Sequence, residues 1–221
     1  MTGGNTSASQ AGRVGRTGKV GRPPAVDSAE TRRRILQAAR ARFAADGYRA
    51  TTNRLIADDV GITPGALYHY VESKAELYIA VYTDAIDTVY SSFERVAAEV
   101  DGLVAKFLAV MHEAAALARQ DRTITGFIVA AALEAQRHPD LLAMLGDQRG
   151  RHARFFNSIV ADAARRGELP ADADTGAIAD LFGSILTGLA RVSVAAGDER
   201  RYGAAVAELE RLLNGRFSAS A

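Results

Sequence analysis

The sequence predicts an all-α protein with a small N-terminal three-helix head and a larger C-terminal helical domain. Residues 51–70 have the spacing of two short helices that cross around a tight turn, a helix-turn-helix. Beyond Val100 apolar residues recur at helical spacing, and no segment shows the alternation of a β-strand. We therefore expect three parts, residues 1–27, 28–75 and 76–221.

Residues 1–27 are rich in Gly, Ser and Thr and lack periodicity, which predicts a disordered basic arm. Gly21-Arg22-Pro23 resembles the centre of a minor-groove hook, although Val20 stands where an arginine is expected. Extended basic arms enter narrow minor grooves. A solvated, unbound tail is an equally good interpretation of the same charges.

A first helix is predicted between Asp27 and Gly47, because Asp27 and Glu30 form a capping-box pair and glycine is a common C-terminal stop. Its apolar positions are Ile35, Leu36, Ala39 and Phe43. A second capping box, Ser73 with Glu76, opens a long helix after the motif. The apolar positions of that helix include Leu77, Val81, Ile86, Val89 and Phe93.

The motif itself satisfies several local rules at once. Ala57 is small where the second helix passes over the first, and Gly61 takes the positive φ of a turn without steric penalty. Thr63 is a good N-cap for the second helix, and Pro64 loses no hydrogen bond at its first position. The apolar wedge between the helices contains Ile56, Val60, Ile62 and Leu67.

Glycine and proline separate the later helices. The residues that mark their ends are His138-Pro139, Gly167, Pro170, Gly197 and Asn214-Gly215. A chain of 221 residues with 48% hydrophobic content buries a substantial core. The absence of cysteine excludes disulfides and thiolate zinc sites. No apolar run approaches the roughly 18 residues of a membrane span, and no apolar signal region is present, so we expect a cytoplasmic protein.

Charge divides unevenly along the chain. Residues 1–75 contain 12 Lys and Arg against 6 Asp and Glu, whereas residues 76–221 contain 15 against 20. The N-terminal third therefore carries a net charge of +6 and suits a polyanion. The run Arg32-Arg33-Arg34 alone is also explained as a solvated helix face.

Enzymes form the competing class. The histidines show no paired spacing of a helical zinc site, and the sequence has neither a phosphate-binding glycine loop nor a nucleophile elbow. We therefore expect no catalytic residue, no metal and no cofactor.

The motif region resembles the tetracycline-repressor family of bacterial transcription regulators. The residues that carry the resemblance, at their intervals here, are Phe43, Gly47, Tyr48, Thr51, Thr52, Ile56, Ala57, Val60, Gly61, Leu67, Tyr68 and Lys74. They lie within about residues 30–78, and the remainder matches only in length and helical character. The resemblance implies a DNA-binding head, a helical domain that binds a small effector, and a homodimer.

Carried over by position, the resemblance implies DNA contacts at both helices of the motif. The candidates are Thr52, Asn53, Arg54, Thr63, Pro64, Gly65, Ala66, Tyr68, His69 and Lys74. Helix N-termini and Lys and Tyr side chains favour phosphate, and the front of a recognition helix reaches the major groove. The second helix has no Arg, Asn or Gln for bidentate base bonds, so Arg54 is the best candidate for a guanine contact. Tyr68 as a core aromatic and His69 as a solvated residue are the alternatives.

For the distal domain, the candidate lining of an apolar effector pocket is Ile86, Phe107, Met111, Phe127, Phe155 and Phe156. Such positions are core more often than pocket, which is the alternative for each. Two late helices contain small residues that permit close helix approach, so we expect the dimer interface there. Its candidates are Ile159, Ala163, Ile178, Phe182, Ile185, Gly188 and Leu189.

Together these expectations describe a homodimer that binds a pseudo-palindromic operator, as a repressor that a largely apolar or aromatic small molecule releases. The alternatives are a helical DNA-binding regulator without small-molecule control and a helical protein-interaction module.

Overall fold

The computed structural model describes Met1 and residues 25–145, 148, 150–196 and 199–215. Its helices are α1 (Ala25–Ala50), α2 (Asn53–Val60), α3 (Pro64–Leu67), α4 (Lys74–Ala98), α5 (Leu103–Gln120), α6 (Arg122–Arg137), α7 (Pro139–Met144), α8 (Arg151–Arg165), α9 (Thr175–Ala196) and α10 (Glu199–Leu213). These described parts contain no strand, so the all-α prediction is confirmed. The Gly21-Arg22-Pro23 segment of the expected arm lies outside the described residues, as does Gly197.

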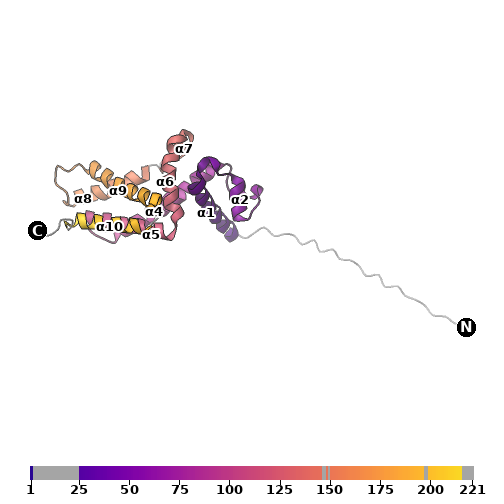
Figure 1. Ribbon diagram of the computed structural model, residues 1–221, viewed down its shortest axis with the longest axis horizontal. Coiled ribbons are helices and arrows are strands. Elements are labelled where there is room, and N and C mark those ends of the chain that lie inside the picture. The colour runs from indigo at the N-terminus through magenta and orange to yellow at the C-terminus, as the bar shows by residue number, and fades with distance from the viewer. Residues whose placement is uncertain (2–24, 146–147, 149, 197–198, 216–221) are drawn as a thin grey trace.

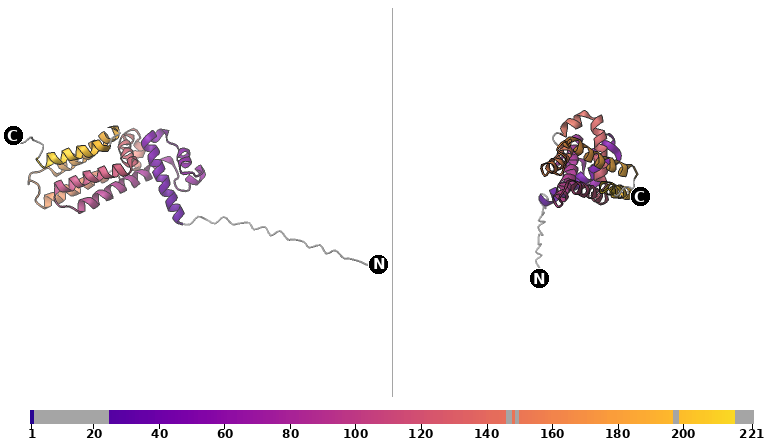
Figure 2. Two further views of the ribbon diagram at one scale, coloured as in Figure 1. Left: turned by 60° about the horizontal axis from the view of Figure 1, so that its bottom comes forward. Right: turned by 90° about the vertical axis from the view of Figure 1, so that its left-hand side faces the viewer.

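The helices form an elongated molecule with a head at one end (Figure 1). Helices α1, α2 and α3 make up the head, and α4 leads from it into a bundle with α5, α8, α9 and α10. Helix α6 lies between the head and the bundle and packs against α1, and the left-hand view in Figure 2 shows the head and the bundle at opposite ends of the molecule.

The head has an apolar core that continues into the body. Phe43, Ile56 and Leu67 are buried in it, and so are Leu77 of α4 and Phe127 of α6. We call this set of residues the head cluster. Because α4 and α6 contribute to it, the packing of the head reaches beyond residue 75.

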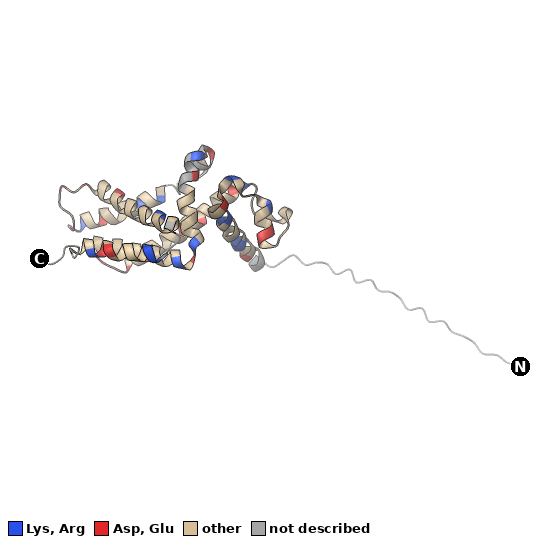
Figure 3. Ribbon diagram, in the orientation of Figure 1, with Lys and Arg blue, Asp and Glu red and all other residues tan. Residues whose placement is uncertain are grey.

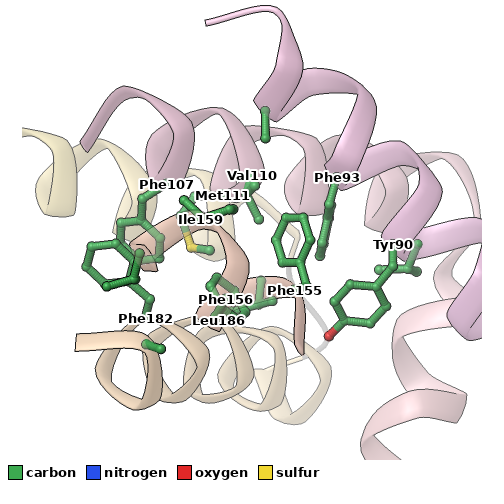
Figure 4. Packing of buried hydrophobic residues seen from close by; sticks show 14 of the residues in the cluster. Tyr90, Phe93, Phe107, Val110, Met111, Phe155, Phe156, Ile159, Phe182 and Leu186 are labelled. Carbon is green, nitrogen blue, oxygen red and sulfur yellow. The ribbon is translucent and has the colours of Figure 1, made fainter. Parts of the chain in front are cut away.

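A second apolar core fills the helical bundle (Figure 4). Phe107 of α5 stacks on Phe182 of α9 with ring centroids 3.9 Å apart, and Phe155 of α8 packs edge-on against Tyr90 of α4 at 5.5 Å. We call this the distal cluster. Aromatic pairs of this kind add to the stability gained from burial alone.

Several helix ends agree with the local rules. Gly47 has φ 77° and breaks the helical geometry of α1, Gly61 has φ 74°, and Gly167 has φ 72° after α8. The Oγ of Ser73 accepts a hydrogen bond from the Glu76 N–H at 3.1 Å, as a capping residue does.

The predicted start of α1 at Asp27 is wrong, because the helix already begins at Ala25. Alanine is the strongest helix former, which favours this extension beyond the capping pair.

Candidate nucleic-acid interface and ligand cavity

The turn of the helix-turn-helix is fixed by backbone and side-chain caps. Thr52 Oγ1 accepts from the Leu55 N–H at 3.2 Å and caps α2. At the other end Gly61 takes the left-handed conformation, and the Ile62 N–H donates to Ala57 O at 3.0 Å. Thr63 Oγ1 then accepts from the Ala66 N–H at 3.1 Å, so α3 begins where the sequence predicts.

Helix α3 is short and anchored by one side chain, Leu67, which is fully buried. Thr63, Pro64 and Gly65 at its start are exposed, and Ala66 is half-buried. These residues present the front of a recognition helix to solvent, as a major-groove reader requires.

The flanking polar candidates are also accessible. Tyr68 is 54% exposed and His69 is exposed, which disfavours the interpretation of Tyr68 as a core aromatic. Arg54 is exposed and has no hydrogen bond or ion pair with the residues that the structure describes. Asn53 is half-buried, and its Oδ1 has no hydrogen-bond partner within the described chain.

Lys74 is engaged inside the head. Its Nζ donates to Tyr48 O at 2.9 Å and Thr51 O at 3.1 Å, approaches Arg49 O at 3.4 Å, and lies 4.4 Å from the centre of the Tyr48 ring. An ammonium group has three donors, and carbonyls at a helix C-terminus attract a positive charge. These contacts give Lys74 a positioning role at the end of α1, and its phosphate contact stays a prediction.

Basic residues of the head are partly neutralised within it (Figure 3). Arg42 of α1 forms a two-point ion pair with Asp59 of α2, with distances of 2.6 and 2.8 Å. The hydrogen bond from Arg42 lowers the pKa of Asp59. In the Arg32-Arg33-Arg34 run, Arg33 pairs with the Glu30 carboxylate and Arg34 donates to Val60 O at 2.6 Å. Much of this charge thus holds α1 and α2 together.

Arg40 joins the head to the body. Its side chain is 8% exposed, and its Nε donates to Thr123 Oγ1 at 2.9 Å. The guanidinium also pairs with Asp121 and lies 3.5 Å from an Asp84 oxygen. Asp121 caps α6 by accepting from the Thr123 N–H at 2.9 Å, so one buried cation links α1, α4 and the start of α6.

Helix α1 continues along α6 beyond Arg40. The rings of Phe43 and Phe127 are 6.3 Å apart, and a Cβ built on Gly126 would lie 3.8 Å from Ala44 Cβ. The close approach at Gly126 shows that α6 presents one continuous face to the head.

A cavity of about 310 Å³ lies in the body between α4, α5, α6, α8, α9 and α10. Its walls are mainly apolar and aromatic. They are formed by Tyr82, Ile86, Val89, Tyr90, Phe93, Ala114, Leu117, Thr125, Ile128, Val129, His152, Leu186, Thr187, Ala190, Arg191 and Tyr202. Figure 4 shows two of these wall residues, Tyr90 and Phe93, which also belong to the distal cluster.

Among the candidate pocket residues, only Ile86 lines this cavity. Phe127 belongs to the head cluster, 5.3 Å from the Tyr78 ring, and does not line this cavity. Phe107 and Met111 are fully buried in the distal cluster, which fits the alternative of core positions.

The last two pocket candidates border grooves on the outside of the helical bundle. Phe155 borders a groove between α4, α5 and α8, and Phe156 borders one between α8 and α9. Neither residue lines the cavity between α4 and α10.

The cavity holds a polar pair. The Tyr90 hydroxyl lies 2.6 Å from His152 Nδ1. Burial lowers the pKa of His152, although Asp180 acts in the opposite direction, so the imidazole is neutral at neutral pH. A Cβ on Gly183 would lie 2.4 Å from His152 Nε2, which shows how closely α9 approaches this ring.

Most of the dimer-interface candidates face the interior of the subunit. Ile159, Ala163 and Phe182 are buried within the distal cluster, and Ile178, Ile185 and Leu189 pack against it. Only Gly188 is exposed. On α9 the large apolar residues left exposed are Leu181 at 56%, Val192 at 51% and Val194 at 44%.

Several residues of the cavity and of the exposed side of α9 were not named from the sequence, although most of them are related by helical spacing. Tyr82, Val89 and Phe93 lie on the same face of α4 as Ile86, because residues three and four apart on a helix are neighbours. The same rule places Leu181, Ser184 and Val192 in one row along α9 with Gly188, which the sequence analysis had named. Arg191, His152 and Tyr202 come from different helices, and no sequence spacing joins them.

The fold and this interface define a helix-turn-helix regulator with a helical body, and known proteins agree. Residues 35–81 match the model of the bacterial regulatory proteins, tetR family. Over 193 residues the chain is 28% identical to the HTH-type transcriptional regulator UidR of Escherichia coli (strain K12), covering 86% of this chain and 94% of that protein.

Two solved structures extend the comparison. Salmonella enterica GusR is 25% identical with a TM-score of 0.66, covering 86% of this chain and 96% of that one. AibR in complex with isovaleryl coenzyme A and operator DNA has a TM-score of 0.60 at 19% identity, covering 73% and 86%. Residues 35–81 thus place the head of the chain in the tetR family of bacterial regulatory proteins, and the relatives indicate a DNA-binding transcriptional regulator.

Proposed function

We propose that this protein is a homodimeric repressor that binds a two-fold operator and leaves it when a small molecule occupies the cavity of about 310 Å³. The observation that carries the proposal is the double role of α6. Thr125, Ile128 and Val129 of α6 line the cavity, while Thr123 and Phe127 contact α1.

A shared helix of this kind couples the two sites energetically. A ligand that fits the cavity better in one arrangement of α6 favours the position of α1 that goes with it. The shift equals the differential affinity of the ligand for the two arrangements, and no more. The structural similarity to AibR, which was solved in complex with isovaleryl coenzyme A and operator DNA, supports the same scheme.

We propose that DNA is read by the exposed ends of α2 and α3. Thr52, Asn53 and Arg54 present the start of α2, and Thr63, Pro64, Gly65 and Ala66 the start of α3. Tyr68 and His69 follow as phosphate contacts, since both are exposed. Lys74 fixes the end of α1 beneath them.

The exposed row of α9 supports a homodimer. The segment Thr175–Ala195 has a mean hydropathy of 1.4, yet only 28% of its most apolar window is buried. By length and composition it is the one helix among the described residues that could cross a membrane, a test that core helices of soluble proteins also pass. We assign its apolar row, Leu181, Ser184, Gly188 and Val192, to a two-fold contact, because contiguous apolar surface marks interaction sites.

The test begins with selection of bound duplexes from a random pool by the purified protein. We expect a pseudo-palindrome with half-sites about one helical turn apart. A metabolite library is then screened for release of the labelled duplex. Selection of no sequence would refute operator binding and favour an interaction module. A specific operator from which no compound releases the protein would favour a regulator without small-molecule control.

A further inference from the structure

The described walls of the cavity contain one cationic side chain, Arg191, and no acidic one. With a volume of about 310 Å³, the cavity lies at the low end of the roughly 300–1,000 Å³ typical of small-molecule pockets. Its walls therefore suit one compact ligand with an apolar body.

Arg191 stands where the cavity meets the outer groove between α8 and α9, because it lines both. Its side chain forms no hydrogen bond or ion pair with any residue in the described part of the chain. A guanidinium always carries its charge and presents a planar fork of donors that matches a carboxylate. An unpaired arginine beside an apolar cavity is thus suited to an anionic oxygen pair.

A second observation comes from Tyr202 of α10. The residue lines the cavity and is 3% exposed, and its buried hydroxyl has no hydrogen-bond partner among the described residues. The neighbouring hydroxyl, that of Tyr90, is occupied by His152 at 2.6 Å. Buried polar groups are nearly always satisfied, so an unpartnered hydroxyl in a pocket wall points to a ligand atom.

We propose that the cavity binds a small ring-bearing organic acid as its carboxylate. The apolar ring lies among the aromatic and aliphatic walls, the carboxylate pairs with Arg191, and the Tyr202 hydroxyl bonds to an oxygen of the ligand. The inference rests on the proposed function only for the consequence of binding, which is release from DNA.

The experiment is calorimetric titration of the full-length protein with matched probe pairs. The acids are benzoate, 1-naphthoate, 4-phenylbenzoate and cyclohexanecarboxylate, and each is compared with its primary amide, which has nearly the same shape and no charge. We expect at least one acid to bind roughly tenfold or more tightly than its amide, since charged hydrogen bonds are about twice as strong as neutral ones.

Arg191→Gln should abolish the preference for the acid. Arg119→Gln is the matched control, because Arg119 is an exposed arginine on α5 that does not line the cavity. This control should keep the preference. Tyr202→Phe should weaken binding of the same acid severalfold and leave the folded protein intact.

Several results would overturn the inference: binding of amides as tight as that of acids, no binding of any acid, or an unchanged preference in Arg191→Gln. Loss of the dimer in Arg191→Gln by sedimentation would assign this residue to the subunit contact instead. The operator assay is separate. If an acid binds but never releases the protein from the operator, ligand control is refuted and the acid site is retained. If only other compounds release the protein, ligand control is retained and the acid site is refuted.

Discussion

Neutralising Asp121 should loosen the junction between the head and the body. Asp121 accepts from Arg40 of α1, and its Oδ1 accepts from the Thr123 N–H at 2.9 Å. Asp121→Asn removes the charge that pairs with Arg40 but keeps a cap on α6, because Asn caps helices about as well as Asp. The substitution therefore separates the ion pair from the cap.

The size of the effect follows from burial. Removal of one partner from a fully buried pair costs about 3–5 kcal/mol. Here Arg40 keeps Thr123 Oγ1 at 2.9 Å and Asp84 at 3.5 Å, and the Asp121 side chain is 28% exposed. We therefore expect Asp121→Asn to lower the free energy of unfolding by about 1–2 kcal/mol. Operator affinity should fall as well, because the head is less firmly positioned.

The pH dependence has a definite sign. Burial by itself would raise the pKa of Asp121, but hydrogen bonds from Thr123 and the charge of Arg40 outweigh it and lower that pKa. A lowered pKa in the folded state contributes stability above the unfolded value of about 3.9, and this stability is lost as pH falls through the folded value. The difference between wild type and Asp121→Asn should be full at neutral pH and shrink below about pH 4.

Urea unfolding followed by circular dichroism measures the stability, and fluorescence anisotropy with the selected operator measures binding. Asp174→Asn is the matched control, because Asp174 Oδ1 accepts from the Ala177 N–H at 3.0 Å and forms no ion pair within the described residues. That variant should stay within about 0.5 kcal/mol of wild type. Equal losses for both variants, or a difference that does not depend on pH, would refute the role of the Arg40 junction.

Four further substitutions test other parts of the molecule. Lys74→Ala should lower the free energy of unfolding by about 1–3 kcal/mol, since the half-buried carbonyls of Tyr48 and Thr51 lose their donor; unchanged urea unfolding with weaker DNA binding would instead support the phosphate contact. Leu181→Glu should shift sedimentation from dimer to monomer, and an intact dimer would exclude this face of α9. Gly183→Ala should cost about 1–3 kcal/mol through its clash with His152, and a melting temperature equal to wild type would contradict that packing. Tyr202→Phe without ligand should not lower the melting temperature, and a clear loss would reveal a protein partner for its hydroxyl.

The helix-turn-helix could be predicted because its determinants are local. Gly61 at the turn, Thr63 as the cap and Pro64 at the first helical position each act on their immediate neighbours, and the structure shows the same turn and cap. The long-range partners of the head could not be predicted in this way. Lys74 lies far along the chain from Tyr48, and only the folded backbone brings its ammonium to that carbonyl.

The interior of the body was harder to predict, since apolar residues look alike whether they face a core or a cavity. Phe127 fills the head cluster although it lies on the same helix as Ile128, which lines the cavity. Adjacent residues on a helix point in different directions, so one position decides the assignment. The sequence shows that this segment is helical but not which of its residues face α1 and which face the cavity.

The dimer face illustrates a related difficulty. Helix α9 is apolar on more than one side, and the prediction, which rested on small residues that permit close helix approach, placed the interface on the side of Phe182. That side packs inside the subunit, whereas Leu181 and Val192 remain exposed. Knowledge of which helices lie beside α9 is needed to decide between the two faces.

The central claim, that α6 couples the cavity to the head, is tested most directly by locking α1 to α6. The sequence contains no cysteine, and a Cβ at Gly126 would lie 3.8 Å from Ala44 Cβ, within the roughly 3.5–4.5 Å of a disulfide. In the double variant Ala44→Cys, Gly126→Cys, the measurement is the operator Kd with and without a ligand that releases the reduced protein. We predict that oxidation brings the ratio of the two Kd values to about one. This holds whichever arrangement of α1 and α6 the disulfide locks, because the locked arrangement cannot convert to the other. Reduction of the disulfide should restore the response to ligand. Release of the oxidised protein at the same ligand concentration as the reduced protein would contradict coupling through α6.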